Sequence, residues 1–136
     1  MDLDHARDFL HAHHWAVLAT TRTDGRPQLS PVTAGLGDDG RVLISTRQTA
    51  MKTKNIERDP RASLCVFTDQ FFGEWIQAEG TAEIIRLPEA MDLLVDYYRR
   101  VSGEHPDWDE YRAAMNRDRR VILAITLSRA GPDRSG

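Results

Sequence analysis

Length, composition and charge restrict this protein to a few classes. The 136 residues suffice for one domain, and 40% hydrophobic with 29% charged residues is typical of a folded globular chain. A net charge of −3, a single cysteine and the lack of an apolar run near ~18 residues exclude a basic polyanion binder, an internal disulfide framework and a membrane span. The acidic N-terminal segment lacks the apolar core of a signal peptide, so we expect a cytoplasmic protein.

The first half of the chain is predicted to form one helix followed by an antiparallel meander. The predicted elements are a helix over residues 2–13 and strands over residues 15–21, 26–36 and 41–46. Asp-Gly pairs at Gly25 and Gly40 separate these strands. Such pairs favour tight hairpin turns because glycine accepts a positive φ without steric cost.

The second half mixes strands with short helices. The predicted elements are helices over residues 49–59, 89–101 and 107–117 and strands over residues 62–68, 74–86 and 120–128. Thr49 is expected to cap the first of these helices. The strand 62–68 is apolar on both faces, which predicts a central, fully buried strand. Gly80 interrupts a cleanly alternating strand, which indicates a bulge or a bend.

The number and spacing of the strands define the fold class. Six strands joined mostly by tight turns favour a small closed antiparallel barrel over a parallel sheet, which would need a helix after each strand. The predicted class is therefore mainly β, or α+β, with short flanking helices. Residues 1–130 form a single domain in this interpretation, and residues 131–136 form a disordered tail.

Few residues offer catalytic chemistry of their own. The chain has no Gly-x-Ser-x-Gly elbow and no P-loop, and Cys65 lies in an apolar strand, where a structural thiol is expected. His11, His13 and His14 cluster near a helix end. Asp8 is close in sequence, but no further ligand group completes a closed metal site, so we predict no metal.

Two polar segments remain to be explained. Gln28 and Ser30 share one face of a strand, which either meets solvent or lines a pocket. The second segment joins strand-end hydroxyls to a helix start, and its polar residues are Ser45, Thr46, Lys52, Thr53 and Asn55. Hydroxyls, helix N-terminal amides and a cation together bind phosphate, so this segment is a candidate phosphate site.

The second polar segment lies within the basic part of an otherwise acidic chain. Between Arg47 and Arg61 five basic residues stand against two acidic ones. This stretch is either a solvated surface loop or a site for a small anionic ligand. The overall charge and the lack of interleaved aromatic residues disfavour nucleic acid as its partner.

These segments also carry a family resemblance, in the strings TTRTDGRPQLSPV, ISTRQTAMKTKNIERDPRASLCV and SGEHPDWDEYRAAMNRDRRVIL. The chain resembles the split-barrel flavin and deazaflavin oxidoreductases, the superfamily of pyridoxamine 5′-phosphate oxidase-like proteins. Within this superfamily it is most similar to the actinobacterial FDOR-B branch, which uses the deazaflavin coenzyme F420. The similarity runs from about Trp15 to Leu127.

The resemblance implies a six-stranded antiparallel split barrel that forms a homodimer, with a cofactor site in each cleft between protomers. The implied cofactor-binding residues are Gln28, Ser30, Ser45, Thr46, Met51, Lys52, Thr53, Asn55, Trp75, Gln77 and Arg120. Lys52 and Thr53 would lie near the cofactor phosphate. Trp75 and Gln77 would approach from the partner protomer, and Arg120 would reach the acidic tail of F420.

One residue departs from the pattern of this branch. Close relatives often carry an arginine two positions before the lysine, where this chain has Ala50. One cation fewer weakens the grip on a polyglutamate tail, unless Lys54 or Arg47 replaces it.

The function implied by the resemblance is hydride transfer between F420 and a small electron-poor organic substrate. The chain offers no catalytic nucleophile, and no proton donor is assigned, which fits an enzyme whose cofactor carries the chemistry. The alternatives are an FMN-dependent enzyme of the same superfamily and a non-catalytic F420- or flavin-binding carrier. The apolar residues of helices 89–101 and 107–117, with Phe71, Phe72 and Trp75, exceed what a small barrel buries, which separately predicts a homodimer.

Overall fold

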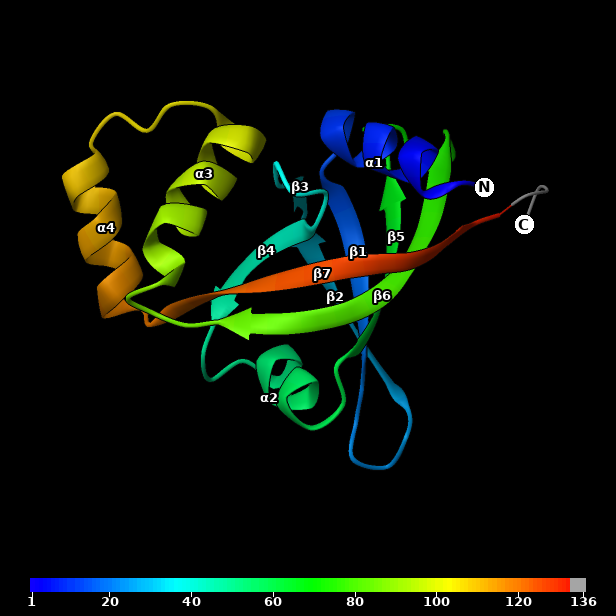
Figure 1. Cartoon of the computed structure of the whole chain (residues 1–136), viewed down its shortest axis with the longest axis horizontal. Coiled ribbons are helices and arrows are strands. Elements are labelled where there is room, and N and C mark those ends of the chain that lie inside the picture. The colour runs from blue at the N-terminus through cyan, green and yellow to red at the C-terminus, as the bar shows by residue number, and fades with distance from the viewer. Residues whose placement is uncertain (133–136) are drawn as a thin grey trace.

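The structure, a computed structural model, describes residues 1–132 and contains a strongly curled sheet with four helices around it (Figure 1). The strands are β1 (Trp15–Thr21), β2 (Pro27–Thr33), β3 (Gly35–Leu36), β4 (Val42–Arg47), β5 (Arg61–Phe67), β6 (Trp75–Ile85) and β7 (Arg120–Gly131). The helices are α1 (Leu3–Ala12), α2 (Met51–Arg58), α3 (Ala90–Ser102) and α4 (Trp108–Arg117). The predicted mainly β class with short helices is confirmed.

The sheet is antiparallel throughout and has the strand order β2-β1-β5-β6-β7-β4-β3. It curls until β2 lies close to β4, yet no ladder joins these two strands. The predicted strand 26–36 is divided into β2 and β3 at Ala34, whose backbone N–H donates to the His14 carbonyl. The described residues therefore form seven strands rather than six, in a barrel that stays open between β2 and β4.

Two hydrophobic clusters stabilise this arrangement. The first fills the barrel, and its ends are covered by Leu10 of α1 and Ile56 of α2 (Figure 1). The second lies outside the barrel, where α3 and α4 pack against β4 and β7 through residues such as Leu94, Tyr111 and Ile122. The expectation that the apolar residues of α3 and α4 stay largely exposed in a single chain is wrong. The second cluster buries much of their apolar surface within one chain.

Three local expectations need correction. The strand β5 is buried on one face only, because Ser63, Cys65 and Phe67 lie half-buried on the outer side of the sheet. Thr49 does not cap α2, since the helix begins at Met51 and its N-cap residue makes no side-chain hydrogen bond. The last strand extends to Gly131, the first residue of the predicted tail, and residues 133–136 lie outside the described part of the chain.

The irregularity predicted at Gly80 is confirmed. The register between β6 and β7 shifts between Glu79 and Gly80, so the longest strands of the sheet bend at this point. A Cβ atom on Gly80 would lie 2.0 Å from the carbonyl oxygen of Thr126, closer than any real contact allows. The bend in the barrel wall therefore depends on the absence of a side chain at this position.

Gly80→Ala should destabilise the fold by at least ~3 kcal/mol, because the clash is with backbone of the neighbouring strand and cannot be relieved by a rotamer change. Urea unfolding followed by circular dichroism measures this difference. Thr81→Ser, at the exposed neighbouring position, should stay within ~0.5 kcal/mol of the native protein. Equal stability of the two variants would contradict this account of the bend.

Candidate functional site

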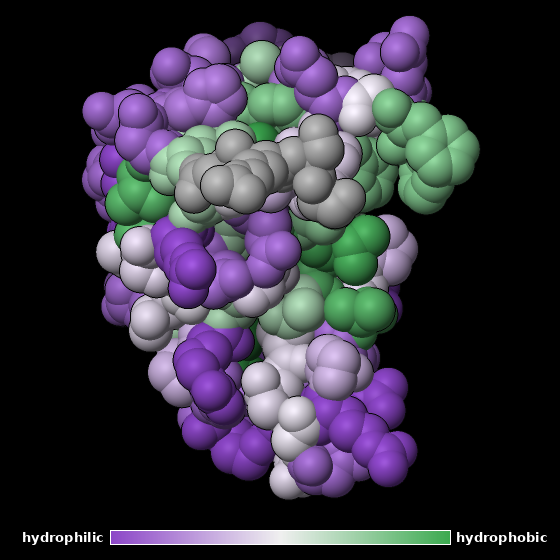
Figure 2. Space-filling view, turned by 90° about the vertical axis from the view of Figure 1, so that its right-hand side faces the viewer, coloured by the Kyte–Doolittle hydropathy of each residue, from purple (hydrophilic) through white to green (hydrophobic). Residues whose placement is uncertain are grey.

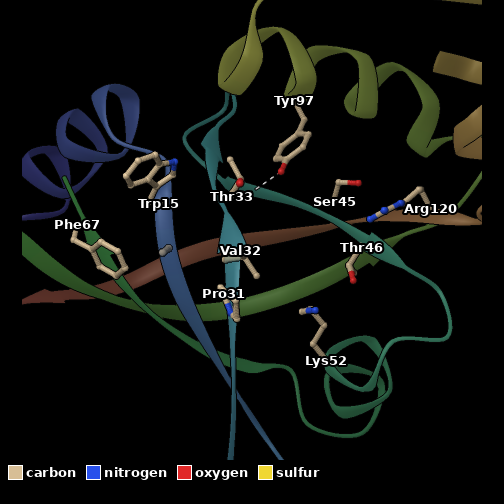
Figure 3. A pocket seen from close by; sticks show the side chains of 11 residues that line it. Trp15, Pro31, Val32, Thr33, Ser45, Thr46, Lys52, Phe67, Tyr97 and Arg120 are labelled. Carbon is tan, nitrogen blue, oxygen red and sulfur yellow. Dashed lines mark hydrogen bonds between the residues drawn. The ribbon is translucent and has the colours of Figure 1, made fainter. Parts of the chain in front are cut away.

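A cavity of about 580 Å³ lies where the barrel fails to close (Figure 3). The short strand β3 pairs only with Val42 and Leu43, so the remainder of β4 presents an open edge. The outer edge of β2 is open as well, because β2 pairs only with β1. Pro31, Val32 and Thr33 of β2 face Ser45 and Thr46 of β4 across the cavity.

One end of the cavity is cationic. Lys52 at the start of α2 and Arg120 at the start of β7 both line it, and the described lining residues include no carboxylate. The Nε atom of Arg120 is buried and has no hydrogen-bond partner among residues 1–132. Burial, and then the nearby charge of Arg120, lower the pKa of Lys52. Two cations held together without a counter-charge favour binding of an anion, which would relieve both costs.

Tyr97 of α3 lines the cavity between the two open edges. Its hydroxyl donates a 2.8 Å hydrogen bond to the carbonyl of Thr33 in β2 (Figure 3). Burial raises the pKa of Tyr97, and the backbone of Ser45 in β4 and the Arg120 charge oppose that rise. The phenol thus remains a neutral donor that attaches α3 to the open edge of β2.

The other end of the cavity is aromatic. Trp15 and Phe67 lie there, away from Lys52 and Arg120 (Figure 3). Trp15 is 56% exposed, although tryptophan usually buries most of its surface. Flat aromatic side chains at one end and cations at the other match a ligand that joins a planar ring to an anionic group.

The structure brings four of the predicted site residues into this cavity: Ser45, Thr46, Lys52 and Arg120. Thr46 faces the barrel interior and is buried, whereas Ser45 points to the side covered by α3. Arg47, which precedes α2, lies directly opposite Arg120 in the β4–β7 register. A third cation therefore stands at the edge of the cationic end. That these residues contact a cofactor stays a prediction.

Three other predicted residues attach α2 to the barrel. The buried Asn55 donates from its amide nitrogen to Gln28 Oε1 (3.0 Å) and to Thr20 Oγ1 (3.1 Å). The fully buried Thr53 donates its hydroxyl to the carbonyl of Arg47 (2.7 Å). In this structure the polar groups of Asn55, Gln28 and Thr53 are engaged within the protein, and they hold the helix that carries Lys52.

The remaining predicted residues lie outside this cavity in the single chain. Met51 is 59% exposed at the first position of α2, and Ser30 is half-buried on the inner face of β2. Trp75 and Gln77 lie on the outer face of β6 and line a separate cavity of about 440 Å³. Gln77 donates to Glu79 there (2.7 Å). Their predicted approach to a partner protomer's cofactor remains a prediction.

Sequence reasoning did not assign Trp15, Phe67 or Tyr97 to the site. Tyr97 belongs to the apolar stripe of its helix, so nothing in the local pattern separates it from a core residue. Trp15 and Phe67 carried a usable signal, because they occupy outward positions of β1 and β5 and pair with one another across the sheet. Two large aromatic residues on the outer face of a sheet indicate a ligand or partner surface.

Residues 1–132 contain no group of three or more His, Cys, Asp or Glu side chains placed to hold a metal ion. The same residues form no helix that is long and apolar enough to cross a membrane. The Cys65 thiol is half-buried, and burial raises its pKa, which disfavours the reactive thiolate.

Comparison with known proteins defines the family. Residues 3–131 match the family model described as pyridoxamine 5′-phosphate oxidase. The match spans nearly the whole chain, and the chain therefore belongs to the pyridoxamine 5′-phosphate oxidase family.

Solved structures with the same fold carry diverse descriptions. A conserved hypothetical protein, Rv2991, from Mycobacterium tuberculosis is 26% identical, with a TM-score of 0.77 and coverage of 100% of this chain and 92% of its own. A protein described as an F420 reductase is 20% identical, with a TM-score of 0.72 and coverage of 92% and 94%. A heme binding protein from Mycobacterium smegmatis is 21% identical, with a TM-score of 0.70 and coverage of 97% and 55%. The ligand of this chain must therefore be argued from its own residues.

Lys52→Ala should weaken binding of FMN, used as a phosphate-bearing probe, by roughly ten- to a hundredfold, because a charge-assisted hydrogen bond is worth ~1.5–3 kcal/mol. Because the pKa of Lys52 is lowered from 10.5, its charge is lost before that pH is reached, and native affinity should fall as the pH rises from neutrality towards 10.5. Lys52→Arg should lessen that fall, since arginine keeps its charge. Fluorescence quenching measures each affinity, and unchanged binding by Lys52→Ala would rule out this site.

Proposed function

We propose that this protein is an oxidoreductase of the FDOR-B type, which transfers a hydride between coenzyme F420 and a small electron-poor organic substrate. The observation that carries the proposal is the cavity between β2 and β4. Its described lining residues include two cations and no carboxylate at one end and two aromatic side chains at the other. F420 joins a planar deazaflavin to a phosphate and an anionic tail, so its chemistry fits both ends of the cavity.

The cofactor, when bound, supplies the hydride, and the chain supplies binding and orientation. Lys52 and Arg120 would neutralise the anionic part, and the buried Nε of Arg120, which has no acceptor within residues 1–132, would gain one. Trp15 and Phe67 offer flat apolar surfaces to the ring. Tyr97, which donates to Thr33 of β2, would border the cofactor in this cavity.

F420 is favoured over FMN by the number of cations near the cavity. A single phosphate is matched by Lys52 and Arg120, and Arg47 lies opposite Arg120 as a further cation. Lys54 is exposed on another side of α2, within the same basic segment. An FMN-dependent enzyme is the second candidate, supported by the family's description as pyridoxamine 5′-phosphate oxidase. The likeness to an F420 reductase supports the first candidate through the shared fold.

Titration of the purified protein with each cofactor should give tighter binding of F420 than of FMN. Lys54→Ala should weaken F420 binding more than FMN binding, because FMN has no tail for an outlying cation to reach. Lys54 lies about 200° around the helix from Lys52, so this variant leaves the phosphate contact in place. Fluorescence quenching at fixed, moderate salt measures the four affinities.

The opposite preference assigns another function. FMN binding tenfold or more tightly, a difference of ~1.4 kcal/mol, would move the protein to the FMN-dependent enzymes. A carrier without turnover is separated by a second measurement, in which reduced F420 is mixed with a panel of enones and quinones. Reoxidation no faster with the protein than without it would identify a carrier.

We further infer that the protein is a homodimer with its cofactor sites at the protomer interface. No described helix packs on the outer face of β1, β2, β5 and β6, where Trp15, Leu29 and Trp75 are exposed, and the loop between β5 and β6 adds the exposed Phe71 and Phe72. Figure 2 shows hydrophobic side chains gathered on one side of the molecule between hydrophilic margins. Trp15 belongs both to this face and to the cavity, so a partner seated on the face would help to enclose the ligand.

Leu29→Asp should convert the dimer to a monomer. Leu29 is 63% exposed on the outer face of β2, so a carboxylate there costs the single chain little but would be buried in the interface. Arg117→Asp, at an exposed position of α4, is the control and should remain dimeric. Sedimentation equilibrium at micromolar concentration distinguishes the two states. A native protein that sediments only as a 15.4 kDa species would refute the inference.

A further inference from the structure

A second cavity of about 360 Å³ adjoins the aromatic end of the first. Trp15, Thr33 and Phe67 line both cavities, so the two spaces are neighbours across these side chains. Beyond them the second cavity is lined by His13 and His14, which connect α1 to β1. Its volume suits a molecule of one or two rings, at the small end of the range for ligand pockets.

The ring of His14 is held in one orientation by the backbone of Ala34. Its Nδ1 atom lies 2.8 Å from the Ala34 carbonyl oxygen, and the Ala34 N–H donates in turn to the His14 carbonyl (2.7 Å). A carbonyl oxygen only accepts hydrogen bonds, so Nδ1 must carry a hydrogen. Nε2 is then the ring nitrogen that this hydrogen bond leaves available to a ligand.

The other titratable groups around this cavity are held differently. The ring of His13 packs on the ring of Phe9 in α1, with ring centres 4.7 Å apart. His13 is also the C-cap residue of this helix. Asp69 is exposed in the loop that joins β5 to β6. His14 is therefore the one titratable group among the described lining residues whose ring is fixed by a hydrogen bond to a buried backbone segment.

We propose that the second cavity holds the acceptor substrate, a small α,β-unsaturated carbonyl compound, and that His14 is the catalytic acid that protonates it. This inference rests on the proposed function. If Lys52 and Arg120 hold the anionic part of the cofactor, Trp15 and Phe67 at the other end would be the residues nearest its ring, and the second cavity adjoins that end. Trp15 and Phe67 give the acceptor an apolar surface, and His14 provides a donor for its carbonyl oxygen.

The step balances as follows. The bound reduced deazaflavin would supply a hydride, which forms a C–H bond at the β-carbon of the acceptor, and would itself be oxidised by two electrons. The π pair of the C=C bond shifts towards the carbonyl oxygen, which takes the proton from Nε2 as the N–H bond of the His14 imidazolium breaks. The enol product returns to the ketone in water, and neutral His14 regains its proton from water.

The test compares His14→Asn with His11→Asn. The asparagine amide nitrogen replaces Nδ1, so the hydrogen bond to Ala34 is retained while the proton donor is lost. His11 is exposed in α1 and lines neither cavity, which makes the same substitution there a matched control. The protein, loaded with reduced F420, is mixed with cyclohexenone, and oxidation of the cofactor is followed in a single turnover.

His14→Asn should slow oxidation by about a hundredfold, within the range that a general acid contributes, and should leave F420 affinity and thermal unfolding unchanged. His11→Asn should oxidise the cofactor at the native rate. If His14→Asn does not fold, His14→Gln replaces it with the same expected loss, since an amide has no proton to transfer.

The outcomes separate this inference from the proposed function. Normal F420 binding with an unchanged oxidation rate in the His14 variant would overturn the role of His14 alone. Failure of the native protein to bind F420 or to oxidise it faster than solution does would overturn the proposed F420 oxidoreductase, and the acceptor site with it.

Discussion

The missing ladder between β2 and β4 is the constraint on which the site depends. A fully closed barrel would pair every backbone group of these strands and leave no space between them. Here β3 is only two residues long, so it covers a small part of the β4 edge. The open backbone groups need other partners, and the Thr33 carbonyl of β2 accepts a hydrogen bond from the Tyr97 hydroxyl. A side chain from outside the sheet thus takes the place of a strand partner at this point and borders the cavity.

Burial and mutual repulsion disfavour the two cations of this cavity as long as no anion is bound between them. Arg120 has a buried Nε atom without a partner among residues 1–132, and Lys52 has a lowered pKa beside it. Arg100 differs, because it is paired with both Asp38 and Asp96. Two neighbouring cations without a counter-charge among the described lining residues are typical of an anion-binding site.

The sequence predicts the strands near their observed positions, because the signals that define each strand are local. The Asp-Gly turns at Gly25 and Gly40 do adopt positive φ, and the alternation of β6 around Gly80 predicted both the strand and its irregularity. The sequence also predicts Ser45, Thr46 and Lys52 as one group because they are close together in the chain, and all three line the cavity. The half-exposed face of β5 was missed, because apolar residues on both faces do not reveal whether a second layer covers each one.

Other features depend on long-range pairing that no local pattern encodes. Arg120 reaches Lys52 because β7 pairs with β4 in a register that sets Arg120 opposite Arg47. Tyr97 reaches the open edges because α3 packs outside the barrel, on the face formed by Leu43 and Ile122. Both placements follow from packing between segments that are far apart in the sequence, and helical periodicity alone describes Tyr97 as a core residue.

The attachment of α2 has a consequence for how tightly a ligand can be held. Asn55 joins this helix to Thr20 and Gln28 of the β1–β2 hairpin, and Glu57 pairs with Arg86 on its other side (2.9 Å). The backbone that carries Lys52 is therefore ordered before any ligand arrives, so the conformational entropy of positioning it is lost during folding. A ligand then loses less binding free energy to ordering the site than it would on a mobile loop. Changes in the β1–β2 hairpin, remote from the ligand itself, would alter affinity by loosening this helix.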